Sequence, residues 1–337
     1  MNNNKKIRIA VDAMGGDYSP ANEVEGAVLA LKNLDNKIVI VLVGDKAKID
    51  AELSKYDYNK DDIEVLHTDQ VVTMHDDPTA VLKTKKNSSM AVSLSLHAKK
   101  EADAVISAGN TGAFLAASTV ILGRIKGVSR PTIGTYLPTT TDKKVFILDV
   151  GANIDPKPQF LYEFAVMASI FCEQTSGIKN PSIGLMNVGE ESSKGTEVVQ
   201  ETHKLLKDGD VNFFGNVEGK DVFSGKVDIV VFDGFIGNIL LKFAESLAPF
   251  VKGMMGKLAG SKYSVDEVKL AGSVMKDVFA GLDSQAAGGL PFLGINGISL
   301  VAHGGSTPLA FNNLIHKAID LIETDINTKI ETALNKG

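Results

Sequence analysis

The stretch Ile183 to Val199, IGLMNVGEESSKGTEVV, carries the pattern that decides the fold assignment. Its apolar start, residues 183–188, predicts a buried strand, and the segment from Thr196 onward predicts a helix. The loop between them, Gly189–Gly195, holds two carboxylates, two hydroxyls and a lysine. In an open parallel sheet, ligands bind beyond the carboxyl ends of the strands, where helix N-termini offer free N–H groups to an anion.

Ser192, Ser193 and Lys194 would add two hydroxyl donors and a positive charge to such an anion site. The alternative is a solvent-exposed connector that is polar only because it faces water. Similar loops recur where other strands end, and this recurrence favours the anion site. Glycine-rich polar strand ends occur near residues 12, 109, 153, 189, 233 and 303. We expect them to face one cleft.

Strands and helices alternate from the start of the chain. The apolar runs Ile7–Val11, Lys37–Val43 and Ile63–His67 are separated by two helical segments. A β-α-β-α-β order predicts parallel pairing with right-handed crossovers. The sequence therefore predicts an α/β fold, an α/β/α sandwich with a mostly parallel sheet, and we treat residues 1–337 as a single unit.

Composition limits the possible functions. The net charge of −6 argues against nucleic acid as the main partner, because a phosphate backbone requires clustered cations. The single cysteine, Cys172, excludes an internal disulfide framework and a multi-cysteine metal site, and its apolar neighbours predict a buried side chain. No signal peptide and no apolar run of transmembrane length is evident, which predicts a cytoplasmic protein.

A helical hairpin is predicted over residues 239–282. Apolar residues between 240 and 258 recur at steps of three and four, and the same pattern repeats from 268 to 282. Packing of this apolar face against the core or a partner subunit is the favoured interpretation. The alternative is that the hairpin tip, with Met254, Met255, Leu258, Lys257 and Lys262, touches a membrane surface.

The polar loops suit phosphate chemistry. The dinucleotide fingerprint, the P-loop and the serine-hydrolase elbow are all missing from the sequence. A cleft with Asn110, Lys194, His303 and Ser306 instead suits a free phosphate or phosphoryl group. In an acyl transferase, the simplest route is that phosphate itself attacks the acyl carbonyl while donors stabilise the oxyanion.

Eight ordered motifs together resemble the PlsX family of bacterial phosphate acyltransferases. They are VDAMGGD (11–17), KK-x-SSM (85–90), SAGNTGA (107–113), LDVGAN (148–153), NVGEE-x-x-KG (187–195), GNVEG (215–219), DGF-x-GN (233–238) and HG-x-S (303–306). The resemblance covers the chain from about residue 7 to 320.

The resemblance implies transfer of a long-chain acyl group from acyl carrier protein to inorganic phosphate, without a cofactor or a metal. It also implies a fold like that of isopropylmalate dehydrogenases and phosphotransacetylases, and a homodimer. The hairpin would associate with the inner face of the cell membrane. There the acyl phosphate product would pass to a membrane glycerol-3-phosphate acyltransferase.

Residue roles follow from the same resemblance. The implied catalytic residues are Asp12, Lys194, Asn238 and His303. Phosphate would be bound by Gly109, Asn110, Thr111, Ser192, Ser193, Lys194, Gly195, His303, Gly304 and Ser306. The rest of the substrate cleft would be Gly15, Gly16, Asn153 and Asp233. Apart from the resemblance, the basic patch Lys83, Lys85 and Lys86 is our expected contact for the carrier protein, because that partner is acidic.

The chain departs from the family pattern at five positions. Lysine replaces an expected arginine at Lys83 and Lys220, and Asn87 replaces an aspartate. Ser284 and Ala287 stand where tyrosines are common. Lysine keeps the charge of arginine but loses its bidentate fork, so contacts at Lys83 and Lys220 would be looser.

Three other functions are compatible with parts of the pattern. A phosphotransacetylase would share the fold and the chemistry but would prefer a short acyl chain on coenzyme A. A decarboxylating dehydrogenase of the same fold would need a cofactor and a metal carboxylate cluster. A non-catalytic membrane scaffold would use the hairpin but would not need six polar strand ends.

Overall fold

The computed structural model of this chain describes residues 6–34, 37–259, 262–280 and 289–335. The chain groups into two compact units. Unit 1 comprises Met1–Gly134, Val166–Asn180 and Gly288–Gly337, and unit 2 comprises Thr135–Ala165 and Pro181–Ala287. The interpretation of residues 1–337 as a single unit stays a prediction.

Unit 1 contains a mostly parallel sheet with strand order β3-β2-β1-β4-β11-β10. The strands are β1 (Ile7–Asp12), β2 (Ile38–Gly44), β3 (Ile63–His67), β4 (Ala104–Ser107), β10 (Leu290–Leu293) and β11 (Ser299–Val301). All pair in parallel except β10, which is antiparallel to β11 and to the start of β5 (Thr132–Pro138). The predicted parallel β-α-β-α-β start is confirmed.

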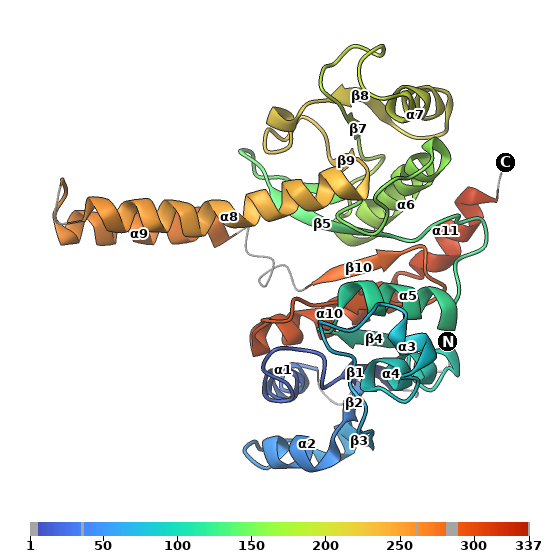
Figure 1. Cartoon of the computed structure of the whole chain (residues 1–337), viewed down its shortest axis with the longest axis vertical. Helices are drawn as coiled ribbons and strands as arrows, with labels where there is room; N and C mark the ends of the chain where they lie inside the picture. The colour runs from blue at the N-terminus through green and yellow to red at the C-terminus, as the bar shows by residue number, and fades with distance from the viewer. Residues whose placement is uncertain (1–5, 35–36, 260–261, 281–288, 336–337) are drawn as a thin grey trace. The chain divides into compact units, whose positions relative to one another are not determined.

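Helices cover both faces of the unit 1 sheet (Figure 1). One face carries α1 (Ala21–Leu31), α2 (Lys46–Leu53) and α10 (Pro308–Glu323), and the other carries α3 (Ala80–Lys83), α4 (Ser89–Ala98) and α5 (Thr111–Ile121). The remaining elements are a 3-10 turn at Lys60–Asp62, α11 (Ile326–Leu334) and the second half of α6 (Pro158–Ser176). Cys172 is buried in α6, as predicted. The central strands are fully buried, so the predicted sandwich is confirmed here.

Unit 2 contains four parallel strands in the order β6-β9-β7-β8. They are β6 (Lys144–Leu148), β7 (Ile183–Met186), β8 (Phe213–Val217) and β9 (Ile229–Val231). The strand, loop and helix expected from the stretch 183–199 are confirmed as β7, a polar loop and α7 (Glu197–Asp208). Thr196 caps α7, because its side chain accepts the N–H of Val199. A 3-10 turn at Gly219–Asp221 follows β8.

The predicted hairpin consists of α8 (Gly234–Leu258) and α9 (Val265–Ala280), which pack side by side (Figure 1). The helical part begins at Gly234, within the DGF-x-GN segment, and residues 281–282 of the prediction lie outside the described residues. Many apolar side chains of the two helices remain exposed within this chain, including Phe243 at 62% and Leu270 at 71%.

Helix α8 differs from the expectation that no apolar segment reaches membrane-spanning length. Among the described helices, α8 alone is long and apolar enough to cross a membrane, judged only by length and composition. Lys242, Glu245, Lys252 and Lys257 interrupt its sequence, which is why no continuous apolar run is evident there.

Three elements were missed by the sequence analysis. Leu290–Leu293 follows two glycines and contains Pro291, a pattern typical of a turn, yet it forms the antiparallel strand β10. Its pairing is short on each side: Leu290 and Pro291 pair with β11, and Phe292 and Leu293 pair with β5. Strand β5 and helix α11 were not assigned at all, because neither shows clear alternation or capping signals in the sequence.

Candidate active site

Unit 1 brings the ends of three neighbouring strands together at one edge of its sheet. Asp12, the last residue of β1, pairs with Ser107 of β4, and Ser107 pairs with Val301 of β11. Because the three strands are parallel, the loops that follow them leave the sheet on the same side. These loops contain the predicted site residues 15–16, 109–111 and 303–306.

The Asp12 carboxylate is buried and is bonded within the protein. The Ser107 hydroxyl donates to Asp12 Oδ2 over 2.7 Å, and Ser107 Oγ accepts the N–H of Gly109 over 3.1 Å. The Met14 N–H donates to Asp12 Oδ1 over 3.3 Å. Burial raises the pKa of the Asp12 carboxyl, against the lowering effect of its hydrogen bonds. This geometry makes Asp12 a support for the two loops, and its predicted catalytic role stays a prediction.

Gly15 lies where the loops after β1 and β4 touch. A Cβ atom on Gly15 would lie 2.7 Å from Asp12 Oδ2 and 2.7 Å from the Gly109 nitrogen. Only glycine allows this close approach of one backbone to another. These close contacts explain why the VDAMGGD motif has glycine at position 15.

A second buried carboxylate, which the sequence analysis did not single out, supports the same glycine pair. Glu23 of α1 is 1% exposed, and its Oε1 accepts the hydroxyl of Ser19. Ser19 Oγ in turn accepts the N–H of Gly16 over 2.7 Å. Glu23 Oε2 is buried without a hydrogen-bond partner in the described structure. Burial raises the pKa of Glu23 to about 7, opposed by the Ser19 hydrogen bond, and the Asp12 charge raises it further.

The loop after β11 presents His303. The side-chain amide of Asn22 donates to the Ser306 carbonyl over 2.8 Å and fixes this loop to α1. Ser306 is buried, Gly304 is half-buried and His303 is exposed. His303 Nδ1 accepts the N–H of Gly305 over 3.2 Å, which leaves the proton of a neutral imidazole on Nε2. His303 can therefore donate from Nε2 to an anion.

Asn110 caps the start of α5. Its Oδ1 accepts the N–H of Ala113 over 3.0 Å. Its Nδ2 donates to the carbonyls of Met74, over 3.3 Å, and Asp76, over 3.4 Å. The Asn110 side chain is therefore used to hold the loop, whereas Thr111, the first residue of α5, is exposed. The donors available at this position, within the described residues, are the Thr111 hydroxyl and the N–H groups of Thr111 and Gly112.

In unit 2, Asp149 organises the loop after β6. Its Oδ1 accepts the N–H groups of Gly151 and Ala152 over 3.0 and 2.8 Å. Its Oδ2 accepts both the backbone N–H and the side-chain amide of Asn153, each over 2.7 Å. Burial raises the pKa of Asp149, against the lowering effect of these four bonds. The predicted cleft residue Asn153 is thus tied to Asp149.

The adjacent start of α8 carries two predicted residues. Asp233 caps the helix, because its Oδ1 accepts the Ile236 N–H over 2.8 Å. Asn238 is half-buried beside Gly151, on which a Cβ atom would lie 3.8 Å from Asn238 Oδ1. No hydrogen-bond partner of the Asn238 side chain is present in the described part of the chain. Asn238 is therefore the polar side chain here that is available to a substrate.

The loop after β7 presents the predicted anion donors. Ser192, Ser193 and Lys194 are all exposed, and within the described residues the Lys194 ammonium has no carboxylate partner. Gly195 has a φ of +85°, and a Cβ atom there would lie 2.5 Å from Asn187 Oδ1. Glycine is required at this position, because other residues rarely adopt the left-handed conformation.

The six predicted strand ends divide equally between the units. Those near residues 12, 109 and 303 belong to unit 1, and those near 153, 189 and 233 belong to unit 2. Within each unit the three ends follow parallel strands of its sheet. The expectation that all six face one cleft stays a prediction.

The predicted basic patch is weaker than its sequence indicates. Lys85 Nζ bonds Asp76 Oδ2 over 2.6 Å and the Val71 carbonyl over 2.8 Å. The hydrogen bond from Lys85 lowers the pKa of Asp76 to about 2, and the Thr73 hydrogen bonds contribute to this shift. Lys83 and Lys86 are exposed and remain available to an acidic partner.

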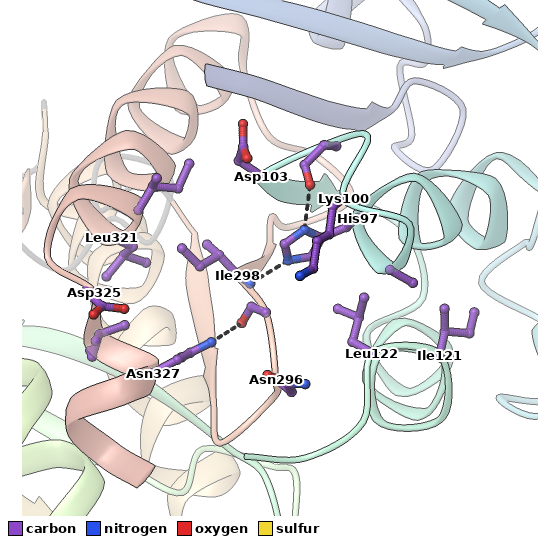
Figure 2. Close-up of a pocket in the computed structure, with 15 residues that line it drawn as sticks. His97, Lys100, Asp103, Ile121, Leu122, Asn296, Ile298, Leu321, Asp325 and Asn327 are labelled. Carbon is purple, nitrogen blue, oxygen red and sulfur yellow. Dashed lines mark hydrogen bonds between the residues drawn. The ribbon is translucent and has the colours of Figure 1, made fainter. Parts of the chain in front are cut away.

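A cavity of about 460 Å³ lies in unit 1 at the amino-terminal ends of β4 and β11, the opposite edge of the sheet (Figure 2). Both ring nitrogens of His97 are occupied there: Nδ1 donates to the Ala102 carbonyl over 2.8 Å, and Nε2 accepts the Ile298 N–H over 2.9 Å. The Asn327 amide donates to the Gly297 carbonyl over 3.2 Å. The side chains of His97 and Asn327 therefore have structural roles in this cavity.

Replacing Glu23 tests the buried carboxylate in unit 1. Its pKa is about 7 in the folded state and near 4.5 in the unfolded state, so the folded state binds the proton more tightly. The free energy of unfolding should therefore fall by about 3 kcal/mol as the pH rises from about 4.5 to about 7. In the Glu23→Gln variant this fall should be missing.

Urea unfolding of both proteins at pH 5 and pH 8 measures the effect. Subtracting the variant from the wild type removes the contributions of groups that do not interact with Glu23. Equal pH dependence in the two proteins would show that Glu23 is ionised alike in the folded and unfolded states.

Comparison with known proteins identifies the family. The model of the family described as "Fatty acid synthesis protein" matches residues 7–329. A phosphate acyltransferase of Chlorobaculum parvum is 43% identical, covering 98% of this chain and 99% of that protein. Phosphate acyltransferases of Dictyoglomus turgidum and Clostridium novyi are 41% and 43% identical over 98% of this chain.

Solved structures show the fold. A phosphotransacetylase from Streptococcus pyogenes matches with a TM-score of 0.63 at 17% identity, covering 95% of this chain and 94% of its own. A branched-chain phosphotransacylase from Enterococcus faecalis matches with a TM-score of 0.55 at 14% identity, covering 93% and 98%. The expected phosphotransacetylase-like α/β fold is confirmed. The chain belongs to the fatty acid synthesis protein family, the PlsX family of acyltransferase enzymes.

Proposed function

We propose that this enzyme transfers a long-chain acyl group from acyl carrier protein to inorganic phosphate. The products would be acyl phosphate and free carrier protein, for the synthesis of phosphatidic acid and phospholipids. The observation that carries the proposal is the exposed Lys194 beside Ser192 and Ser193, on the loop between β7 and α7. A lysine without a carboxylate partner among the described residues, next to two hydroxyls, suits an anion.

The transfer is a single nucleophilic substitution reaction at the acyl carbonyl carbon. A phosphate oxygen forms the new C–O bond, the thioester C–S bond breaks, and the thiolate of the carrier takes a proton from water. Phosphate is partly dianionic at neutral pH and is already a nucleophile, so placement matters more than a general base. Lys194 would hold the phosphate charge, and donors such as His303 Nε2–H and the Asn238 amide would stabilise charge that develops on oxygen.

The remaining predicted residues take supporting roles in this proposal. Asp12 and Asn153 hold their loops through the hydrogen bonds described above, and Asp233 caps α8. Lys83 and Lys86 would contact the acidic carrier protein, whereas Lys85 already pairs with Asp76. Binding of the carrier through these lysines should weaken as the salt concentration rises.

The helical hairpin would bring the enzyme to the membrane, where its apolar acyl phosphate product is consumed. Phe243, Phe250 and Leu258 of α8 are 62%, 64% and 39% exposed in the part of the chain that the structure describes. An exposed apolar surface edged with lysines suits an anionic bilayer or a partner subunit. We propose a cytoplasmic homodimer that touches the inner face of the cell membrane, where a membrane glycerol-3-phosphate acyltransferase would consume the acyl phosphate.

Thiol release from long-chain acyl carrier protein, with and without inorganic phosphate, tests the reaction. We expect phosphate-dependent release by the wild type and a loss of at least about 100-fold in the Lys194→Met variant, because the charge that binds phosphate is removed. The matched control is Lys207→Met, an exposed lysine in the last turn of α7, which should retain wild-type activity.

Three outcomes would contradict parts of this proposal. Activity only on a short-chain coenzyme A thioester would make the enzyme a phosphotransacetylase. Release without phosphate dependence would reject phosphate as the acceptor. Equal activity of the two lysine variants would remove Lys194 from the reaction.

Vesicle flotation tests the hairpin. Protein mixed with vesicles of anionic phospholipid should float with them, and a Phe250→Asp/Leu258→Asp variant should not, because charges on this surface oppose insertion. Val120→Asp, at a 65% exposed position of α5 outside the hairpin, is the control and should float like the wild type. Equal flotation of all three proteins would place the membrane contact, if any, elsewhere.

A further inference from the structure

The loop between β7 and α7 is held by side chains that lie outside its exposed tip. Gln200, in the first turns of α7, donates from Nε2 to the Ser193 carbonyl over 2.9 Å and to the Gly195 carbonyl over 3.2 Å. Asn187, at the end of β7, donates from Nδ2 to the Lys194 carbonyl over 3.1 Å. Three consecutive carbonyls of the loop are therefore bonded to side-chain amides of unit 2.

A fourth carbonyl is held from β8. The side-chain amide of Asn216 donates to the Glu191 carbonyl over 2.9 Å. Asn216 Oδ1 must then be an acceptor, and it lies 2.9 Å from His203 Nδ1. His203 therefore carries its proton on Nδ1 and fixes the orientation of the Asn216 amide. The His203 ring itself packs edge-on against Phe213, with 5.0 Å between ring centroids.

These bonds determine where the loop's N–H groups point. In a trans peptide the C=O and the following N–H point in opposite directions. Holding the carbonyls of residues 191, 194 and 195 therefore turns the N–H groups of Ser192, Gly195 and Thr196 the other way. Within the described residues, none of these three N–H groups has an acceptor. Successive N–H groups around a left-handed residue form a concavity that binds anions, and Gly195 has a φ of +85°.

We propose that Gln200, Asn216 and His203 are positioning residues that hold this loop in its phosphate-binding conformation. Gln200 and His203 belong to none of the motifs that indicate the family, so they support the phosphate site through the loop backbone alone. This inference rests on the proposed function, because it assigns phosphate to Lys194 and to the N–H groups of Ser192, Gly195 and Thr196.

Two variants that remove one donor each test the inference. Gln200→Met keeps the length of the side chain but cannot donate, and His203→Phe keeps the ring against Phe213 but cannot donate to Asn216. Each should raise the KM for inorganic phosphate about three- to tenfold, as expected for one lost hydrogen bond in the support of the loop. The KM for the acyl donor and the urea midpoint should stay close to the wild-type values.

The matched control is Glu201→Met, at an exposed position of α7 next to Gln200. A purely structural role would lower the urea midpoint or change both KM values together. An unchanged KM for phosphate in both donor variants would overturn the inference while leaving the proposed function intact. A wild-type enzyme whose rate does not depend on phosphate would overturn the proposed function and the inference with it.

Discussion

Hydrogen bonds from buried side chains to loop backbones are the constraint on which this structure depends. Asp149 accepts four N–H bonds from residues 151–153, and the Asp12 and Glu23 carboxylates each reach a glycine N–H through a serine hydroxyl. A carboxylate without water is costly unless donors surround it. Each acid is thus stabilised by the loop that it shapes.

These hydrogen bonds also distinguish the residues that support the loops from the residues that can bind a substrate. The side chains of Asp12, Asn110, Asn153 and Asp233 are already hydrogen-bonded within the protein. Lys194, Ser192, Ser193, Asn238 and His303 Nε2 keep free hydrogen-bonding capacity among the described residues. The loop after β7 shows this division most clearly. Four of its carbonyls accept side-chain amides of unit 2, and among the described residues the N–H groups of Ser192, Gly195 and Thr196 have no acceptor.

The sequence was sufficient for the parts of the fold that depend on local patterns. Apolar runs followed by polar glycine loops predicted the parallel strands, and the 183–199 stretch predicted β7, its loop and α7. Strand β10 was missed because Pro291 and two glycines mimic a turn, and only its neighbours β11 and β5 make it a strand. Glu23 and Gln200 were missed for a related reason: each lies inside a helix and reaches its loop only in three dimensions. Asp149 could have been found, since it ends an apolar strand within a predicted motif.

The most direct test of this account is whether inorganic phosphate binds the free N–H groups of the loop after β7. Protein labelled with ¹⁵N-glycine and titrated with phosphate should show a saturable shift of the Gly195 amide signal, with Gly253 of α8 as the unaffected reference. The phosphate concentration at half-saturation should agree with that of the acyl-transfer reaction. An unshifted Gly195 signal at phosphate concentrations that saturate the enzyme would contradict the assignment of phosphate to this loop.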